Sequence, residues 1–135
     1  MTEQASILVD TNVILDVITL DPQWADWSQL QLGQYHDRML INPMIYAELC
    51  YRAREPAEVD AIITVLGFQY RQLSRPALFF ASQAYKAYRE NGGQKSAPLP
   101  DFFIGAHAQE LKIPILTRDI KRYRTYFPQV TLVSP

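Results

Sequence analysis

Short apolar runs alternate along the chain with segments in which apolar residues recur every three or four positions. The runs have the length of buried strands, and the periodic segments have the spacing of helices that pack on one face. The runs predict strands at residues 7–9, 39–41, 68–73, 114–117 and 130–133. Strands that alternate with helices predict an α/β domain with a mostly parallel central β-sheet flanked by α-helices.

Residues that favour helix ends mark the predicted helices between these strands. Most of the starts are side chains that can cap a helix, and one is a proline, which is common in a first turn. The predicted starts are Asp10, Asp21, Asn42, Pro56, Ser74 and Asp101. In the second of these helices we expect Trp24, Trp27 and Leu30 to face inward. Residues 92–100 are expected to be a flexible stretch that leads into Asp101.

Length and composition are those of one ordinary globular domain, residues 1–135. The chain is 48% hydrophobic and 20% charged, and its lone cysteine, Cys50, excludes an intramolecular disulfide. The first ten residues have no basic region and only a three-residue apolar run. The expectation is therefore a cytoplasmic protein without a secretory signal or a membrane span.

The net charge of -1 conceals an uneven distribution. Residues 1–60 hold ten acidic and three basic residues, whereas residues 61–135 hold four acidic and ten basic ones. Such a split allows an acidic pocket beside a basic surface. A solvated surface of mixed charge explains the same numbers, so charge alone does not decide between the two.

Four carboxylates stand where local structure would bring them together. Asp10 and Asp119 follow predicted strands, and ligands of open α/β sheets bind beyond the carboxyl ends of the strands. Glu48 and Asp101 lie near the starts of helices that leave the same edge. Taken singly, each acid is explained as a helix cap, an exposed helical residue or a loop residue.

Burial and repulsion favour a cation at this place. Asp10 follows a fully apolar strand with no neighbouring base, and several buried carboxylates are costly unless a cation joins them. Mg²⁺ prefers carboxylate and water oxygens. His36 and His107 have no partner at a spacing that suggests a softer metal, so we expect His107 to be a packed residue.

Four short segments resemble those that carry the acids of PIN-domain ribonucleases. They are Val-Asp-Thr-Asn-Val at 9–13, Tyr-Ala-Glu-Leu at 46–49, Leu-Pro-Asp-Phe-Phe-Ile-Gly-Ala-His-Ala at 99–108, and Leu-Thr-Arg-Asp at 116–119. They occur in the family's order across nearly the whole chain, with the acids separated by 38, 53 and 18 residues. The resemblance is strongest to VapC-type toxins of toxin–antitoxin modules.

The resemblance implies a metal-dependent endoribonuclease. Asp10, Glu48, Asp101 and Asp119 would hold Mg²⁺ or Mn²⁺ and would be the catalytic residues, with Asn12 and Thr117 in support. It also implies an RNA substrate, a cognate antitoxin and a homodimer. Beside the last acid, the basic residues Arg118, Lys121, Arg122 and Arg124 would hold RNA phosphates, unless they form a solvated helix face.

Two other functions remain open at this point. Residues 10–13 are also similar to the start of phosphatases of the haloacid dehalogenase type, in which Asp10 would be the nucleophile. Those enzymes place a second aspartate two residues on, where this chain has Asn12. The third alternative is a non-catalytic module that binds protein or nucleic acid and uses the acids only as helix caps.

Overall fold

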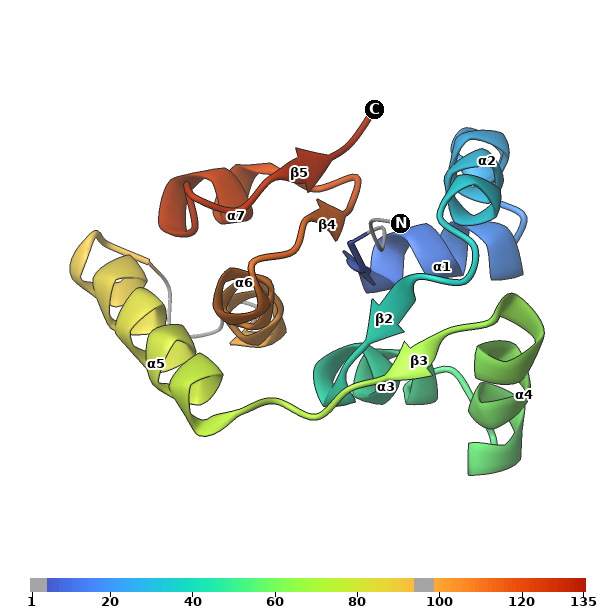
Figure 1. Cartoon of the computed structure of the whole chain (residues 1–135), viewed down its shortest axis with the longest axis horizontal. Helices are drawn as coiled ribbons and strands as arrows, with labels where there is room; N and C mark the ends of the chain where they lie inside the picture. The colour runs from blue at the N-terminus through green and yellow to red at the C-terminus, as the bar shows by residue number, and fades with distance from the viewer. Residues whose placement is uncertain (1–4, 94–98) are drawn as a thin grey trace.

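The computed structural model describes residues 5–93 and 99–135, and a parallel sheet of five strands forms its centre. The strands lie in the order β3-β2-β1-β4-β5. They are Ile7–Val9 (β1), Met39–Ile41 (β2), Gln69–Tyr70 (β3), Ile115–Leu116 (β4) and Leu132–Val133 (β5). The predicted α/β fold with a parallel sheet is confirmed (Figure 1).

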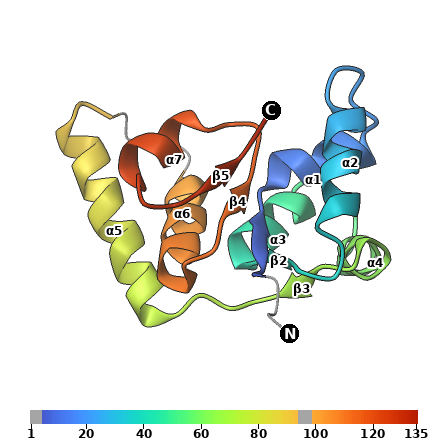
Figure 2. The ribbon, with the colours of Figure 1, turned by 45° about the horizontal axis from the view of Figure 1, so that its top comes forward.

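Helices cover both faces of the sheet. The described helices are Thr11–Ile18 (α1), Ala25–Gln34 (α2), Pro43–Cys50 (α3), Pro56–Leu66 (α4), Arg75–Glu90 (α5), Leu99–Leu111 (α6) and Lys121–Tyr126 (α7). Helices α1, α2 and α4 lie on one side, and α5, α6 and α7 lie on the other (Figures 1 and 2). Helix α3 contacts α1, α4 and α6, so it joins the two groups.

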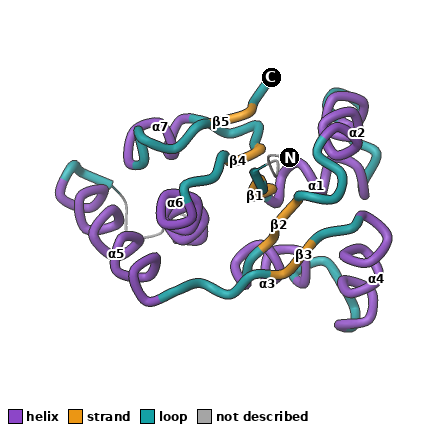
Figure 3. The backbone as a smooth tube through the Cα atoms, viewed as in Figure 1, coloured by secondary structure: helices purple, strands orange, loops and turns teal. Residues whose placement is uncertain are grey.

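The order of the strands creates a switch point between β1 and β4. From β1 the chain proceeds outward to β2 and β3, and then crosses back to β4 and β5 on the other side of β1 (Figure 3). Strands β1 and β4 are neighbours, and the amide of Asp10 donates to the carbonyl oxygen of Leu116 at 2.9 Å. Connections leave these two strands in opposite directions, and in open α/β sheets ligands bind beyond the carboxyl ends of the strands at such a point.

The core packs against both faces of the central strands. All residues of β1 and β2 are buried, as expected for strands covered on two sides. Between α6 and α7, Phe102, Tyr123 and Phe127 are at most 1% exposed. Burial of each such side chain contributes about 1.5–3 kcal/mol, so this cluster fixes α7 over the sheet.

Several predicted element bounds differ from the structure. Strand β3 is limited to Gln69–Tyr70 within the predicted 68–73, because it is an edge strand with both residues exposed. Strands β4 and β5 are each shorter than the predicted runs. Helix α6 begins at Leu99, which puts Asp101 in its first turn rather than at its start. Of the stretch expected to be flexible, residues 94–98 lie outside the described residues.

The prediction for the second helix was wrong in its start and at Leu30, although Trp27 packs against the core as expected. Asp21 caps a turn by accepting from the amides of Gln23 and Trp24 at 2.9 Å each, and α2 itself begins at Ala25. Its buried residues are Ser28 and Leu32, whereas Leu30 is 67% exposed. The shift follows from Ser28, a polar residue that is buried because it has a hydrogen-bond partner in α1.

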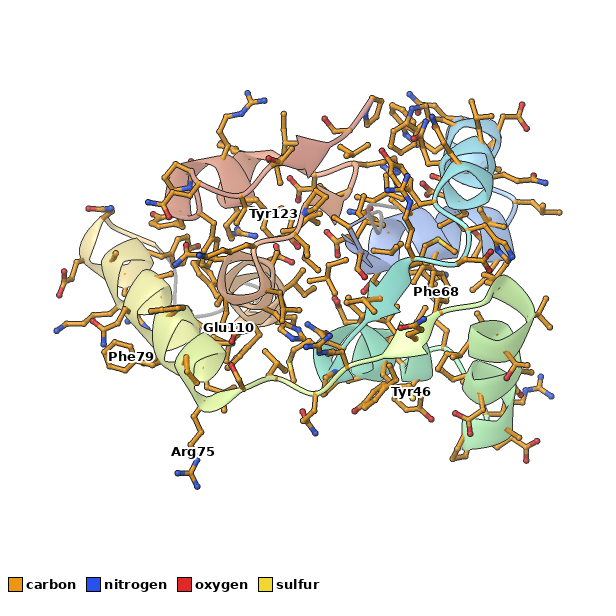
Figure 4. The ribbon with its side chains drawn as sticks, viewed as in Figure 1. Tyr46, Phe68, Arg75, Phe79, Glu110 and Tyr123 are labelled. Atoms are coloured by element: carbon orange, nitrogen blue, oxygen red, sulfur yellow. The ribbon has the colours of Figure 1, made fainter. Side chains whose placement is uncertain are left out.

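Helix α7 was expected only under the alternative that the basic residues beside Asp119 form a solvated helix face. Its sequence, Lys-Arg-Tyr-Arg-Thr-Tyr, has no apolar periodicity, and its inward side is formed by Tyr123. Tyr123 points from α7 into the molecule in Figure 4, whereas Arg75 and Phe79 point away from α5. None of the described helices has the length and apolar character that crossing a bilayer requires.

Candidate active site

Asp10 lies at the end of β1 and caps α1. Its Oδ1 accepts from the amide of Thr11 at 2.8 Å. Its Oδ2 accepts from the hydroxyl of Thr117 at 2.8 Å and from that of Tyr123 at 2.9 Å. The side chain is buried, and donors from α1, from the loop after β4 and from α7 hold this carboxylate in one orientation at the switch point.

Burial governs the ionisation of Asp10. Loss of hydration and, to a smaller extent, repulsion by Asp101 raise the pKa of Asp10 to about 7, although the hydrogen bonds from Thr117, Tyr123 and Thr11 oppose the change. A carboxylic acid that titrates near neutrality is unusual and is a recognised mark of functional sites. A cation beside Asp10 would favour its charged form.

Glu48 reaches the same region from α3. That helix begins well because Asn42 caps it, accepting from the amide of Ile45 at 3.0 Å, and Pro43 occupies the first turn. The carboxylate of Glu48 is half-buried and accepts from the hydroxyl of Thr11 at 2.8 Å. Its pKa is raised, mainly by burial and also by the charge of Asp101.

Asp101 projects from the first turn of α6 and is paired with Arg122 of α7. The guanidinium Nη1 lies 2.7 Å from Oδ2 of Asp101, and the guanidinium carbon lies over the rings of Tyr88 and Phe102. Burial raises the pKa of Asp101, and this outweighs the opposing effect of Arg122. The surroundings of Asp101 therefore still disfavour its charged form despite the ion pair.

Asp119 is the exposed member of the set. It follows Thr117 in the loop after β4, and its amide donates to the Thr117 hydroxyl at 3.0 Å. Its side chain borders a cavity of about 410 Å³. The other residues that line this cavity are Tyr88, Lys121, Arg122, Thr125 and Tyr126.

Asp101 is electrostatically coupled to each of the other three acids. Its charge raises the pKa of Asp10 and of Glu48, and the charge of Asp119 raises that of Asp101. Within residues 5–93 and 99–135, no three His, Cys, Asp or Glu side chains are close enough as they stand to share one ion. The oxygen donors match the preference of Mg²⁺ and Mn²⁺, but an ion would compete with Arg122 for Asp101.

The two residues expected to support the site both contact Asp10. The Asn12 amide nitrogen lies 3.3 Å from Oγ1 of Thr117 and 3.5 Å from Oδ2 of Asp10.

The four basic residues expected to contact RNA differ in exposure and in ion pairing. Lys121 and Arg124 are exposed, whereas Arg122 is paired with Asp101 and Arg118 with Asp16.

Three residues that the structure brings to the site were not expected there from the sequence. Tyr123 and Thr11 donate to Asp10 and Glu48, respectively, and Asp16 binds Arg118. Only Asp16 left a usable signal, because it stands four residues after Asn12 and so on the same face of α1. Nothing local distinguishes Tyr123 from the other tyrosines of the chain.

Comparison with known proteins identifies the fold family. Residues 7–128 match the PIN domain. The chain belongs to the PIN-domain family. PIN domains are generally nucleases, and the expected resemblance to this family is confirmed. No curated protein matches the chain.

Solved structures with the same fold include chains from toxin–antitoxin complexes. A DNA-bound VapBC complex from Salmonella typhimurium has a chain that aligns with a TM-score of 0.74 and 16% identity, covering 97% of this chain and 98% of that one. A toxin–antitoxin complex from Klebsiella pneumoniae gives 0.71 and 21%, covering 96% and 98%. The FitAcB structure from Neisseria gonorrhoeae gives 0.69 and 21%, covering 96% and 97%. At these identities the likeness establishes the PIN fold alone.

Proposed function

We propose that this PIN domain is a metal-dependent endoribonuclease and the toxin of a toxin–antitoxin module. The observation that carries the proposal is Asp10, a buried carboxylate at the switch point whose pKa is raised to about 7 and whose charge is coupled to that of Asp101. A structural helix cap does not need a buried carboxylate under repulsion from a second acid. A site that binds a divalent cation does.

Asp10, Glu48, Asp101 and Asp119 are the proposed ligands of Mg²⁺ or Mn²⁺ and the catalytic residues. When bound, the ion supplies positive charge at the phosphoryl group and makes water more acidic for attack on phosphorus. Hydrogen bonds from other residues of the chain fix the orientation of two of these acids. Thr117, Tyr123 and Asn12 orient Asp10, and Thr11 orients Glu48.

The cavity beside Asp119 supports an RNA substrate. Lys121 is an exposed residue of the cavity lining. One phosphate of a bound RNA would contact its ammonium group while the phosphodiester bond to be cleaved lies near Asp101. Tyr126 borders the same space and offers an aromatic surface to an unpaired base. Arg124, on the exposed side of α7, extends the positive charge away from the acids.

Similarity to chains from toxin–antitoxin complexes supports a cognate antitoxin as partner. The resemblance to VapC-type toxins further suggests a homodimer in the cytoplasm. The mass of the purified chain in solution tests the dimer directly. Copurification with the product of a neighbouring reading frame tests the antitoxin.

Incubation of the chain with total RNA, in Mg²⁺ and in EDTA, tests the activity. We expect cleavage in Mg²⁺ or Mn²⁺ only, and loss of cleavage in Asp10→Asn, Glu48→Gln, Asp101→Asn and Asp119→Asn. Glu58→Gln is the matched control, because Glu58 is an exposed acid on α4 that accepts from the amide of Arg54.

Two results would contradict the proposal. Full cleavage in excess EDTA would exclude a required metal ion. Retained cleavage in any one of the four acid variants would remove that residue from the catalytic set. Loss of cleavage in Glu58→Gln would show that the assay responds to general instability.

A further inference from the structure

Asp16 is a buried acid that the proposed chemistry does not use. It lies on α1, is 3% exposed and is fully engaged by hydrogen bonds. Its Oδ2 accepts from the Ser28 hydroxyl of α2 at 2.7 Å and from Nε of Arg118 at 2.6 Å, and its Oδ1 accepts from Nη2 of Arg118 at 2.8 Å. A two-point contact of this kind fixes the plane of the guanidinium as well as its position.

The same face of α1 also holds the backbone of Arg118. The amide of Arg118 donates to Oδ1 of Asn12 at 3.2 Å. Asn12 and Asp16 are four residues apart and so stand one turn apart on one face of the helix. Helix α1 therefore accepts hydrogen bonds from both the backbone amide and the side chain of Arg118, in the loop after β4.

An aromatic ring completes the surroundings of this guanidinium. The guanidinium carbon of Arg118 lies 5.1 Å from the ring centroid of Trp24, which in turn packs edge-on against Trp27. Arg118 is only 27% exposed in its side chain. With carboxylate oxygens on one side and an indole over its face, the guanidinium has little freedom left to contact an RNA phosphate.

We propose that Arg118 is a positioning residue, which acts through Asp16 and α1 to hold residues 117–119 in the arrangement that the acids need. Strand β4 has two residues only, so its ladder gives the following loop little support. The loop contains Thr117, which donates to Asp10, and Asp119. The inference rests on the proposed nuclease function and replaces the RNA contact that the sequence suggested for Arg118.

Variants on both sides of the ion pair test this role. We expect Arg118→Met and Asp16→Asn each to lower kcat about 10- to 100-fold, the cost typical of a displaced supporting group. Because the two residues act together, the double variant should be no slower than either single one. KM should be unchanged, and Arg118→Lys, which keeps a cation beside Asp16, should recover part of the loss.

Matched controls come from residues outside the candidate site. Arg38→Met removes an arginine that lies 4.8 Å from the centroid of the Tyr35 ring, before β2. Asp60→Asn removes an exposed carboxylate that accepts from the Tyr46 hydroxyl at 2.9 Å. Both should leave kcat and KM at the level of the unmodified protein.

Two measurements that do not depend on catalysis distinguish a positioning role of Arg118 from a phosphate contact and from a purely stabilising role. In EDTA, Arg118→Met should leave the salt dependence of single-stranded RNA binding unchanged. Amide hydrogen exchange at Arg118 and Asp119 should be faster in Asp16→Asn, although Asp16 contacts neither amide. All variants are compared well below their melting temperatures, where circular dichroism shows them to be folded.

Three results would overturn the inference. A fall of about 0.7 in the log–log salt slope of Arg118→Met, with normal kcat in Asp16→Asn, would mean a direct phosphate contact. Lower melting temperatures with normal kcat and normal exchange would mean that the pair only stabilises the fold. If the unmodified chain cleaves no RNA, the proposed function fails by itself, and unchanged amide exchange in Asp16→Asn would then reject the positioning role independently.

Discussion

Asp10 must ionise in surroundings that oppose its charge. Its pKa is raised from 3.8 to about 7 in the folded chain, so between these values the native state holds a proton that the unfolded chain has lost. Without metal, this acid therefore makes the protein less stable as the pH rises through that window, and the loss ends above about 7. At about 1.4 kcal/mol for each pH unit, the full effect is about 4 kcal/mol.

Asp10→Asn should remove this pH dependence. In EDTA, the free energy of unfolding measured with urea should fall between pH 4 and pH 7 for the unmodified protein relative to the variant. Saturating Mg²⁺ at pH 7.5 should reverse the order, because the unmodified protein gains binding free energy that the variant forfeits. Parallel stability curves for the two proteins, with and without the ion, would contradict both the buried charge and the metal site.

The hydroxyl of Tyr123 is the other residue-scale feature with a measurable effect. Tyr123→Phe keeps the buried ring and removes one donor to Asp10. We expect a loss of about 1.5–3 kcal/mol at pH 8, where Asp10 is ionised, and a smaller loss at pH 5, where it is protonated. Urea unfolding at the two pH values measures the difference.

Tyr46→Phe is the control for this substitution. The Tyr46 hydroxyl also donates to a carboxylate, that of Asp60, but the contact is exposed. Its removal should leave the free energy of unfolding nearly unchanged at either pH, because water replaces an exposed hydrogen bond. Equal effects of the two substitutions would show that burial of Asp10 is unimportant to the strength of its hydrogen bond.

At the scale of elements, the contact between α6 and α7 is set by one glycine. A Cβ on Gly105 would lie 2.3 Å from the ring of Phe127, a buried side chain just after α7. Because α6 carries Asp101 and α7 carries Arg122, this close approach brings the two partners of that ion pair together. A glycine at position 105 is therefore needed both for the packing of the core and for the ion pair in the site.

Gly105→Ala should destabilise the protein although alanine favours a helix. The gain in helix propensity is about 1 kcal/mol, and the overpacking against Phe127 costs about 1–3 kcal/mol. Gly33→Ala on α2 is the matched control, since a Cβ there meets nothing within 4 Å. It should stabilise the protein by up to about 1 kcal/mol in chemical unfolding. A stabilising Gly105→Ala would mean that Phe127 can move away without cost.

At the scale of the whole molecule, the acidic and basic parts of the chain meet within the sheet. Residues 1–60 contribute β1 and β2, and the basic remainder contributes β3, β4, β5 and the helices α5 to α7. The two parts meet where β1 pairs with β4 and where β2 pairs with β3. Asp10 and Glu48 thus come from the acidic part, and Asp101 and Asp119 come from the basic part beside the cations.

Expression without a partner tests the toxin role in cells. We expect the chain to arrest growth when induced alone, and Asp101→Asn to relieve the arrest at equal protein level. Coexpression of the neighbouring antitoxin should restore growth with the unmodified chain. Normal growth with a chain that cleaves RNA in the test tube would place it among PIN nucleases outside the toxin group.

Local patterns in the sequence were sufficient for most elements and for the candidate acids. Strand β1, the cap at Asn42 and the helix that begins at Pro56 depend on neighbours within a few residues, so periodicity and capping rules predict them. The polar residues that follow β1 and β4 lie at one edge for the same reason, because parallel strands share the direction of their carboxyl ends.

Tertiary structure decided which side chains these residues meet. The contacts of Asp10 with Thr117 and Tyr123 join residues 107 and 113 positions apart, and that of Asp16 with Arg118 joins residues 102 apart. No local pattern specifies such pairs. They exist because the sheet places β4 beside β1, and because a carboxylate buried there must find donors in whichever segments that pairing brings close.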